Sequence, residues 1–330
     1  MKKNKKRILI TGIAGFVGSH MADYLLKDKN NQVFGLKRPN ARLQNISHIL
    51  DKITLIDGDL VDETSLVNLL EISKPDQIYH FAALSWVTPS WSMPAAYMQT
   101  NAIGTINLLE AMRVTGCNAR ILTSCTPEEY GDVPKELIPI TEETRIAPVN
   151  PYAASKVAQD VVCQVYFSSY RMKIIRTRAF NHIGPRRDIQ GALASFAYQI
   201  AKIEKGLQEP IIKVGNIEAR RNFTDVRDMV KAYYLAMEKG VYGELYLIGS
   251  TQIYTIKECL EMLITLSSMK EKIKYKIDSK KVRPTELRIL IGKFDKFKRI
   301  THWEPKIPIE KTFKDILDYW RGVIDKEYNI

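Results

Sequence analysis

Tyr152 and Lys156 are a pair of side chains whose types and spacing can do chemistry together. They lie four residues apart, directly behind Asn150 and Pro151, where the pattern predicts the start of a helix. Residues at this spacing share one helix face, so the ammonium can lie close to the phenol, favour the phenolate and lower the pKa of the tyrosine. Such a phenol can accept a proton from an alcohol while a hydride leaves the carbon atom.

A glycine-rich turn near the amino terminus predicts a dinucleotide site. Residues 8–10 form an apolar run typical of a short buried strand, and glycines follow at intervals of three before a helical pattern begins. Glycine lets the backbone approach a phosphate closely, and the first N–H groups of a helix favour an anion. The residues expected to contact the cofactor here are Gly12, Gly15, Phe16, Val17 and Gly18.

Strands and helices alternate through the first half of the chain. The patterns predict strands at residues 8–10, 32–36, 53–56, 77–81, 120–123 and 173–179. They predict intervening helices at residues 64–71, 100–115 and 152–170. This alternation indicates an α/β fold of the Rossmann type, a doubly wound parallel sheet that binds its ligand at the carboxyl ends of the strands.

The second half of the chain is less regular. Beyond about residue 181 the alternation is interrupted by prolines at positions 185, 210, 284, 305 and 308. We expect residues 1–180 to form the cofactor-binding domain that carries Tyr152 and Lys156. Residues 181–330 are expected to form mainly a smaller carboxyl-terminal substrate-binding lobe, with some segments returning to the sheet.

The ends of the second and third predicted strands help to choose the cofactor. Lys37 and Arg38 follow the second strand, where a carboxylate would bind the ribose of NAD and a cation accommodates the extra phosphate of NADP. The sequence therefore favours NADP, with NAD as the alternative, although cations in a loop are often only solvated. Asp59, followed by Leu60, ends the third strand and can either meet the adenine ring or cap a turn.

Composition narrows the class of protein further. The 330 residues include 49 lysines and arginines against 37 acidic residues, a net charge of +12. The lysines are scattered, which argues against nucleic-acid binding and suits an anionic small substrate. No run approaches the roughly 20 apolar residues of a membrane helix. The apolar run behind the basic amino terminus is also too short for a signal peptide.

Cysteine and histidine spacings predict neither a disulfide framework nor a metal site. Cys117, Cys125, Cys163 and Cys259 lie far apart, which fits a reducing cytoplasm. His80 and His182 have no partner at a metal-ligand spacing, so we expect no metal.

Several motifs resemble those of the extended short-chain dehydrogenase/reductase superfamily. They are the glycine turn, His80-Phe81-Ala82-Ala83 and the Tyr152 to Lys156 segment. Residues 178–187, 214–228 and 283–286 are similar to GDP-mannose 4,6-dehydratases and the related GDP-4-keto-6-deoxy-mannose reductases. The resemblance covers nearly the whole chain. It implies cofactor contacts from Ala82 and Ala83, a GDP-sugar substrate, and a homodimer or tetramer.

The segment after the fifth strand bears on the reaction. The resemblance implies that Thr126 hydrogen-bonds the C4 oxygen of the sugar, that Tyr152 deprotonates it and that Lys156 holds the cofactor ribose. Glu128 would then remove the C5 proton before water is lost from C6.

Pro127 departs from the dehydratase pattern. Related dehydratases carry a serine or an aspartic acid there, which can help to protonate the leaving hydroxyl, whereas proline has no donor. Reductases of this branch can also carry a glutamate near position 128. Arg186-Arg187 looks more like the dehydratases, so the sequence favours a dehydratase with the reductase as the alternative. A non-catalytic NADP sensor would not need Thr126, Tyr152 and Lys156 together.

Substrate contacts are predicted mainly in the carboxyl half. Arg220 or Arg221 and Arg283 suit a diphosphate through their guanidinium forks, although a surface salt bridge is the alternative for Arg220 and Arg221. The resemblance adds Asn181 and Asn216 near the diphosphate and sugar, and Glu286 at a hydroxyl or guanine edge. Ser85 is either a sugar contact or a helix cap. The predicted substrate-binding set is Ser85, Asn181, Asn216, Arg221, Arg283 and Glu286.

Overall fold

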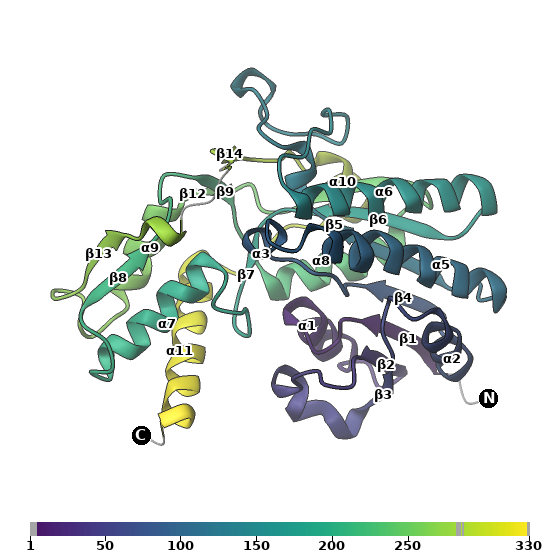
Figure 1. The fold of residues 1–330 in the computed structure, drawn as a ribbon, viewed down its shortest axis with the longest axis horizontal. Coiled ribbons are helices and arrows are strands. Elements are labelled where there is room, and N and C mark those ends of the chain that lie inside the picture. Colours follow the sequence, from purple (N-terminus) through teal and green to yellow (C-terminus); the bar gives the residue numbers. More distant parts are fainter. Residues whose placement is uncertain (1–4, 282–284, 286, 329–330) are drawn as a thin grey trace.

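A seven-stranded parallel sheet forms the centre of the chain, in a computed structural model that describes residues 5–281, 285 and 287–328 (Figure 1). Its strand order is β11-β6-β5-β4-β1-β2-β3. The strands are β1 (Lys6–Thr11), β2 (Asn31–Lys37), β3 (Ile53–Asp57), β4 (Gln77–His80), β5 (Arg120–Cys125), β6 (Ile174–Ala179) and β11 (Leu245–Ile248). This confirms the predicted doubly wound α/β fold, and each of the six predicted strands is present.

Helices cover both faces of the sheet. Ile8 and Ile10 pack in the cluster formed with one helical layer, whereas Leu9 packs in the other, because successive strand residues point to opposite faces. One layer comprises α1 (Phe16–Leu25), the 3-10 helix η1 (Gln44–Lys52), α8 (Val226–Lys239) and α10 (Asp295–Thr301). The other comprises α2 (Glu63–Ser73), α5 (Gly104–Val114) and α6 (Pro151–Tyr170).

The register of the strands brings their carboxyl ends to one edge. Thr11 of β1 lies opposite Leu36 of β2 and His80 of β4, and His80 lies opposite Thr123 of β5. The segments that follow these strands therefore meet at the same edge. They include α3 (Val87–Ser90), α4 (Pro94–Tyr97), the π-helical segment η2 (Met98–Ile103), and the 3-10 helices η3 (Pro127–Tyr130) and η4 (Lys135–Leu137).

The predicted helix at residues 100–115 has two parts in the structure. The π-helical η2 runs directly into α5. Asn101 of η2 binds the loop after β4, since it accepts from the Leu84 amide at 2.8 Å and donates to the Leu84 carbonyl at 2.9 Å. The Asn101 amide also donates to Ser155 of α6 at 2.9 Å, so this segment ties the loop to the helix that carries Tyr152.

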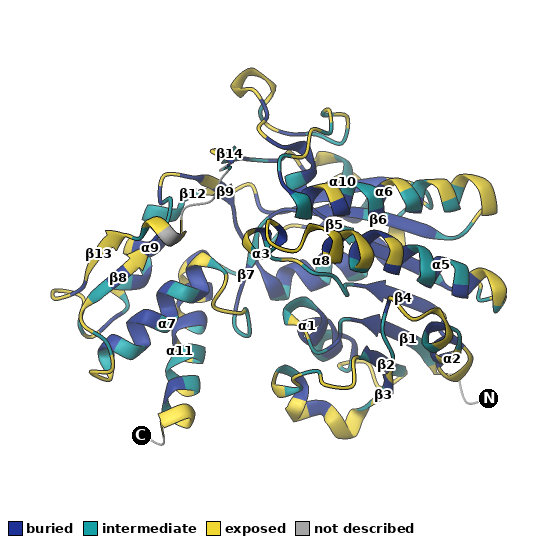
Figure 2. Ribbon diagram, viewed as in Figure 1, coloured by how far each residue is buried: buried dark blue, intermediate teal, exposed yellow. Residues whose placement is uncertain are grey.

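A second hydrophobic cluster lies in the carboxyl half, on the left in Figure 1, where the inward faces of its helices are buried (Figure 2). Its helices are α7 (Ala192–Glu204), α9 (Ile256–Thr265) and α11 (Ile309–Tyr328). Small sheets accompany them: β7 (His182–Ile183) with β10 (Thr224–Asp225), β8 (Ile211–Val214) with β13 (Lys274–Ile277), and β9 (Arg220–Asn222) with β12 (Ile253–Thr255) and β14 (Ile289–Leu290). The 3-10 helix η5 (Ser279–Lys281) follows β13.

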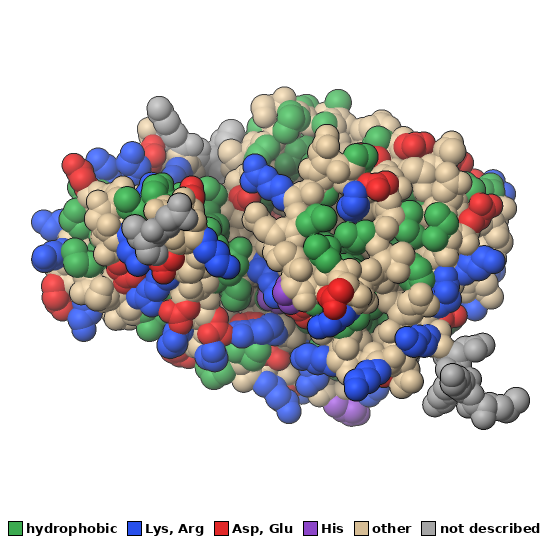
Figure 3. All heavy atoms as spheres, turned by 90° about the horizontal axis from the view of Figure 1, so that it is seen from below, with side chains coloured by type: hydrophobic (Ala, Val, Ile, Leu, Met, Phe, Trp, Pro, Cys, Tyr) green, Lys and Arg blue, Asp and Glu red, His purple; other side chains and the backbone are tan. Residues whose placement is uncertain are grey.

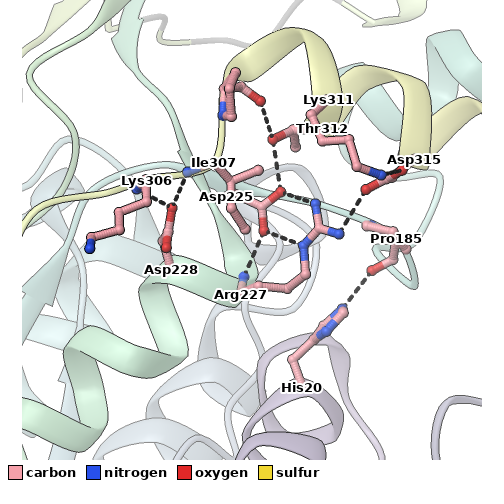
Figure 4. A network of polar contacts seen from close by, with 11 residues as sticks. His20, Pro185, Asp225, Arg227, Asp228, Lys306, Ile307, Lys311, Thr312 and Asp315 are labelled. Carbon is pink, nitrogen blue, oxygen red and sulfur yellow. Dashed lines mark hydrogen bonds and ion pairs between the residues drawn. The ribbon is translucent and has the colours of Figure 1, made fainter.

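Asp225 joins this lobe to the central sheet (Figure 4). It caps the amino terminus of α8 by accepting from the Arg227 amide at 2.8 Å, and it accepts from the Thr312 hydroxyl of α11 at 2.7 Å. The Arg227 guanidinium also binds Asp315 of α11 at 2.7 Å. One carboxylate and one guanidinium thus fix α11 against the start of α8.

Two further contacts hold the same junction (Figure 4). Asp228 accepts from the Lys306 and Ile307 amides, each at 2.7 Å. The His20 ring of α1 is hydrogen-bonded to the Pro185 carbonyl at 3.0 Å, and burial lowers the pKa of His20 to about 4. A neutral imidazole therefore links α1 to the segment that follows β7.

Charged side chains of both signs are interspersed on the face seen from below (Figure 3). Lys274 and Lys276 of β13 are exposed. In the described part of the chain, no helix has both the length and the apolar character that crossing a bilayer requires.

Candidate active site

The turn between β1 and α1 requires glycine for close packing. Gly12 has a φ of 74°, and a Cβ atom on it would lie 2.8 Å from the Ala82 nitrogen. A Cβ atom on Gly18 would lie 2.2 Å from the Gly12 carbonyl oxygen. Gly15 is the N-cap of α1 and has no side chain to accept the first N–H groups of the helix. The backbone here fits the pyrophosphate of a dinucleotide.

The predicted cofactor residues gather along the carboxyl edge of the sheet. The glycine turn meets the end of β4 at Ala82, whose amide donates to Thr11 at 3.2 Å. The predicted residues are Gly12, Gly15, Phe16, Val17 and Gly18 at the turn, Ala82 and Ala83 after β4, Lys37 at the end of β2 with Arg38 after it, and Asp59 and Leu60 after β3.

The charged residues at the ends of β2 and β3 differ in their surroundings. Lys37 forms an ion pair with Asp57, whereas Arg38 is exposed. The Asp59 carboxylate accepts from the Val61 amide at 3.3 Å. This contact caps a turn, which is the alternative to an adenine contact that the sequence analysis gave for Asp59. Arg38 is thus the exposed cation of the predicted pair.

His80 has a structural role beneath this edge. Its two ring nitrogens are hydrogen-bonded to the hydroxyls of Thr11 at 2.8 Å and Thr105 at 3.0 Å. Burial lowers the pKa of His80 to about 3, so the ring is neutral. Within the described residues, no cluster of three or more histidines, cysteines and carboxylates is arranged to hold a metal ion.

Asn150 brings two candidate catalytic segments together. As the N-cap of α6, it accepts from the Ala153 amide at 2.8 Å, and Pro151 follows in the first helical turn. The Asn150 amide group donates to the Glu128 carboxylate at 2.8 Å. Sequence reasoning placed Asn150 only in front of a helix; its capping pattern was visible, but its contact with Glu128 was not.

Tyr152 lies beside Thr126 in the structure. Thr126 is the N-cap of η3, directly after β5, and its side chain lies close enough to Tyr152 to lower the pKa of the phenol. Burial raises the pKa of Tyr152, the carboxylates of Glu128 and Glu129 raise it further, and Thr126 opposes the rise. The pKa of Tyr152 is thus raised, whereas the sequence analysis expected Lys156 to lower it.

The partners of Lys156 explain that difference. Its ammonium donates to the Ser124 carbonyl and to the Gln159 side chain, each at 2.6 Å, rather than pointing at the phenol of Tyr152. Lys156 is buried, which lowers its pKa, and the nearby negative charge of Glu129 opposes that shift. The spacing correctly placed both residues in the first turns of α6, but tertiary contacts decide where the ammonium points.

Arg187 lies over the glycine turn and was used in the sequence analysis only as part of a motif. Its guanidinium carbon is 5.1 Å from the centre of the Phe16 ring and 5.0 Å from that of Trp86. Burial lowers the pKa of Arg187 to about 10, and the nearby Tyr152 hydroxyl opposes that shift. A partly buried cation that packs on Phe16 of the turn suits an anionic ligand.

The predicted substrate-binding residues lie on separate segments and make mostly local contacts. Ser85 is exposed, and the N-cap of α3 is Trp86, so Ser85 does not cap that helix as its alternative role required. Asn181 follows β6, and its carbonyl accepts from the Thr224 amide at 3.0 Å. Asn216 forms a turn in which its side chain accepts from the Glu218 amide at 3.0 Å.

Arg221 of β9 holds main chain in the carboxyl lobe. The residue is buried, and its guanidinium donates to the Leu287 carbonyl at 2.6 Å and to the Arg220 carbonyl at 2.8 Å. Its contact with a diphosphate stays a prediction. Arg283 and Glu286 lie outside the described residues.

A glycine turn on a doubly wound sheet, with a tyrosine and a lysine four apart on α6, defines an extended short-chain dehydrogenase/reductase. A sequence profile described as GDP-mannose 4,6 dehydratase matches residues 9–316. The chain belongs to that family.

Similar proteins include members with two different activities. The GDP-6-deoxy-D-mannose reductase of Pseudomonas aeruginosa is 32% identical, with 98% of this chain and 99% of that protein aligned. GDP-mannose 4,6 dehydratase 1 of Arabidopsis thaliana is also 32% identical, with 96% and 90% aligned.

Solved structures extend this comparison. The structure described as RMD from Pseudomonas aeruginosa, complexed with NADPH, has a TM-score of 0.82 and 31% identity over 97% of this chain and 100% of that one. A UDP-glucose 4-epimerase of Thermotoga maritima has a TM-score of 0.84 and 28% identity over 96% and 99%.

Proposed function

We propose that this chain is a GDP-mannose 4,6-dehydratase that uses NADP, with NAD as the alternative cofactor. The observation that carries the proposal is the position of Glu128. Its carboxylate is held by Asn150 at 2.8 Å and lies close enough to Tyr152 for its charge to raise the pKa of that phenol. A 4,6-dehydration needs a base for the C5 proton as well as one for the C4 hydroxyl, and this arrangement offers both.

The side chains divide the proton transfers between them. Tyr152, in its phenolate form, takes the proton of the C4 hydroxyl, and Thr126 hydrogen-bonds the same oxygen. Glu128 takes the proton from C5 and passes it to the departing C6 hydroxyl, which leaves as water, and C5 takes up a proton from solvent when C6 is reduced. Bound NADP supplies the hydride chemistry, oxidising C4 and reducing C6 within one turnover. Lys156 holds the cofactor ribose with a further donor of its ammonium, which has three and gives two to Ser124 and Gln159.

Support for NADP comes from the end of β2 and from the relatives. Arg38 is an exposed cation where the extra phosphate of NADP is accommodated in this fold. The similar Pseudomonas structure contains NADPH, whereas a similar Bacillus anthracis dTDP-glucose 4,6-dehydratase contains NAD. The turn at Gly12 and Gly15 would hold the pyrophosphate of either cofactor.

A GDP-4-keto-6-deoxy-mannose reductase is the second candidate function. Pro127 favours it, because a proline beside Glu128 has no donor with which to protonate a leaving hydroxyl. The Pseudomonas reductase, whose aligned share is 99%, supports the same candidate. A reductase uses Thr126 and Tyr152 in the opposite direction, with Tyr152 protonating the C4 oxygen.

Mass spectrometry separates the two activities. The purified chain is incubated with GDP-mannose and catalytic NADP, without a reductant. Loss of one water from the sugar nucleotide, with no net cofactor consumption, supports the dehydratase. If GDP-mannose stays unchanged while the 4-keto sugar gains two hydrogens, one as hydride from NADPH and one as a proton, the chain is the reductase.

We also infer a homodimer or tetramer. Val161 and Val165 on α6 are 50% and 51% exposed, and Ile103, at the end of η2, is 40% exposed. These apolar side chains lie on segments that a second copy can cover. A cytoplasmic location and the absence of metal and nucleic-acid partners stay predictions.

A further inference from the structure

A chain of buried charges lies beneath the candidate catalytic residues. Glu129 forms an ion pair with Arg178 of β6 at 2.7 Å, and Arg178 forms a second with Asp160 of α6 at 2.5 Å. The three side chains are between 0% and 3% exposed. Tyr130 completes the surroundings of Arg178. The guanidinium donates to the Tyr130 hydroxyl at 2.7 Å, and its carbon lies 4.8 Å from the centre of the Tyr130 ring.

Glu129 is also bonded to the catalytic turn itself. One carboxylate oxygen accepts from the Thr126 amide at 3.1 Å, while the other faces Arg178. The Glu129 carbonyl accepts from the Ala147 amide at 3.0 Å. A single side chain therefore connects the backbone of Thr126 to β6 and, through Arg178, to α6.

Stability alone gives no reason for this arrangement. Taking three charges out of water costs several kcal/mol per ion, and an apolar cluster of the same volume is often at least as stable. The charges instead fix the relative orientation of the elements that they join, because ion pairs and a guanidinium fork have preferred geometries. The elements joined here carry Thr126, Glu128, Tyr152 and Lys156.

We propose that Glu129 is a positioning residue, which holds the Thr126–Glu128 turn against Arg178 and α6 so that Thr126 meets Tyr152. The proposal rests on the function proposed above, because it assigns Glu129 to the same proton transfers. Glu129 is fully buried and touches the turn through a backbone amide, so it does not contact substrate.

The charge of Glu129 acts on the phenol in a direction that can be measured. Burial raises the pKa of Tyr152, and Glu128, Glu129 and the Cys125 thiol raise it further, while Arg187 is a cation that interacts with the phenol. A neutral residue at position 129 therefore lowers the pKa of Tyr152. The phenolate then forms at lower pH, and the acidic limb of the pH–kcat profile moves toward lower pH.

The surroundings of Glu129 identify a matched control. Burial raises the pKa of Glu129 to about 7, with Asp160 adding to the rise and Arg178 and Lys156 of α6 opposing it. Asp160 lies on the far side of Arg178 and is bonded to Arg176 at 3.1 Å rather than to the catalytic turn. Asp160→Asn thus removes a charge from Arg178 without touching Thr126.

The experiment compares Glu129→Gln with Asp160→Asn in the full-length chain. Glu129→Gln should lower kcat by up to about 100-fold with little change in KM, because the reacting groups are misplaced while the substrate contacts remain. Its acidic limb should move toward lower pH. Amide hydrogen exchange should accelerate at least about tenfold in the peptide covering residues 125–131. Asp160→Asn breaks the link from Arg178 to α6 but keeps the bond between Glu129 and the Thr126 amide, so the exchange at residues 125–131 should stay as in the parent chain.

Two outcomes would overturn the proposal. They are a Glu129→Gln enzyme with parental kcat and pH profile, or one whose defects are matched by Asp160→Asn. If Glu129→Gln does not fold, the double variant Glu129→Leu with Arg178→Leu removes both charges together and should show the same loss of exchange protection. If the parent chain turns over neither GDP-mannose nor the 4-keto sugar, the proposed function fails, and the exchange measurement still decides the role of Glu129.

Discussion

The side-chain amide of Asn150 donates a 2.8 Å hydrogen bond to the Glu128 carboxylate while the same side chain caps α6 in front of Tyr152. One residue therefore sets the distance between the two groups that the proposed reaction uses as bases. The capping function is local, since it depends on the Ala153 amide. The contact with Glu128 depends on how η3 packs against α6.

Substitutions at Asn150 can separate these two functions. Asn150→Ser retains an oxygen that can cap α6 but lacks the amide donor, so the free energy of unfolding should stay close to the parental value. Asn150→Ala should lose about 1 kcal/mol of stability, since the cap is gone. Both should slow the exchange of the C5 proton, measured by deuterium incorporation from solvent. Full exchange in Asn150→Ser would show that Glu128 needs no support from Asn150.

Removal of the Tyr152 hydroxyl should stop the reaction while sparing the cofactor site. In Tyr152→Phe we expect kcat to fall by about 100-fold or more, because the proton acceptor at C4 is lost. NADP affinity, measured by calorimetry, should change little, since the glycine turn is intact. Ser124→Ala alters a side chain bonded to Tyr233 at 2.8 Å and is a control for changes near β5. Near-normal turnover in Tyr152→Phe would contradict the assignment.

Glu128→Gln tests the second base. The amide keeps the shape of the side chain but cannot take a proton, so the variant should oxidise C4 and then stop before water is lost. Reduced cofactor should accumulate, followed by its absorbance, and C5 exchange should be absent. If exchange continues at the parental rate, another group is the C5 base, and the reductase becomes the better candidate.

Trp86 should contribute to cofactor binding through Arg187. The guanidinium is stacked between the Phe16 and Trp86 rings, and a cation–π contact of this kind contributes about 0.5–2 kcal/mol. Trp86→Leu keeps an apolar side chain but removes the aromatic face, so the Kd for NADP should rise about fivefold by calorimetry. Trp91→Leu changes a more exposed indole nearby in sequence and should leave the Kd unchanged.

Acidification should destabilise the junction at His20. Burial lowers its pKa from 6.5 to about 4, so the unfolded chain binds a proton below pH 6.5 that the folded chain does not bind until about pH 4. Stability is therefore retained above pH 6.5 and lost as the pH falls toward 4, by about 1.4 kcal/mol per pH unit for this group. The free energy of unfolding of His20→Gln, measured with denaturant at several pH values, should fall less steeply between pH 6.5 and 4 than that of the parent chain, by about 1.4 kcal/mol per pH unit. An unchanged slope would mean that His20 is protonated in the folded chain.

The fold and the cofactor turn were predictable because their signals are local. Strand period, helix period and glycine spacing are properties of neighbouring residues, and Gly12, Gly15 and Gly18 lie where the turn needs close packing. The positions of Tyr152 and Lys156 on one helix followed in the same way.

Partners far apart in the sequence could not be predicted. The ion pairs of Arg178 join residues from η3, β6 and α6, and only the packing of those elements brings them together. Lys156 turns toward Ser124 because β5 places a main-chain carbonyl within 2.6 Å of its ammonium. The sequence by itself determined the sheet, the glycine turn and the helix that carries the phenol. Only the tertiary structure decided which charges face that phenol, because the electrostatic surroundings of a buried group depend on distances through space.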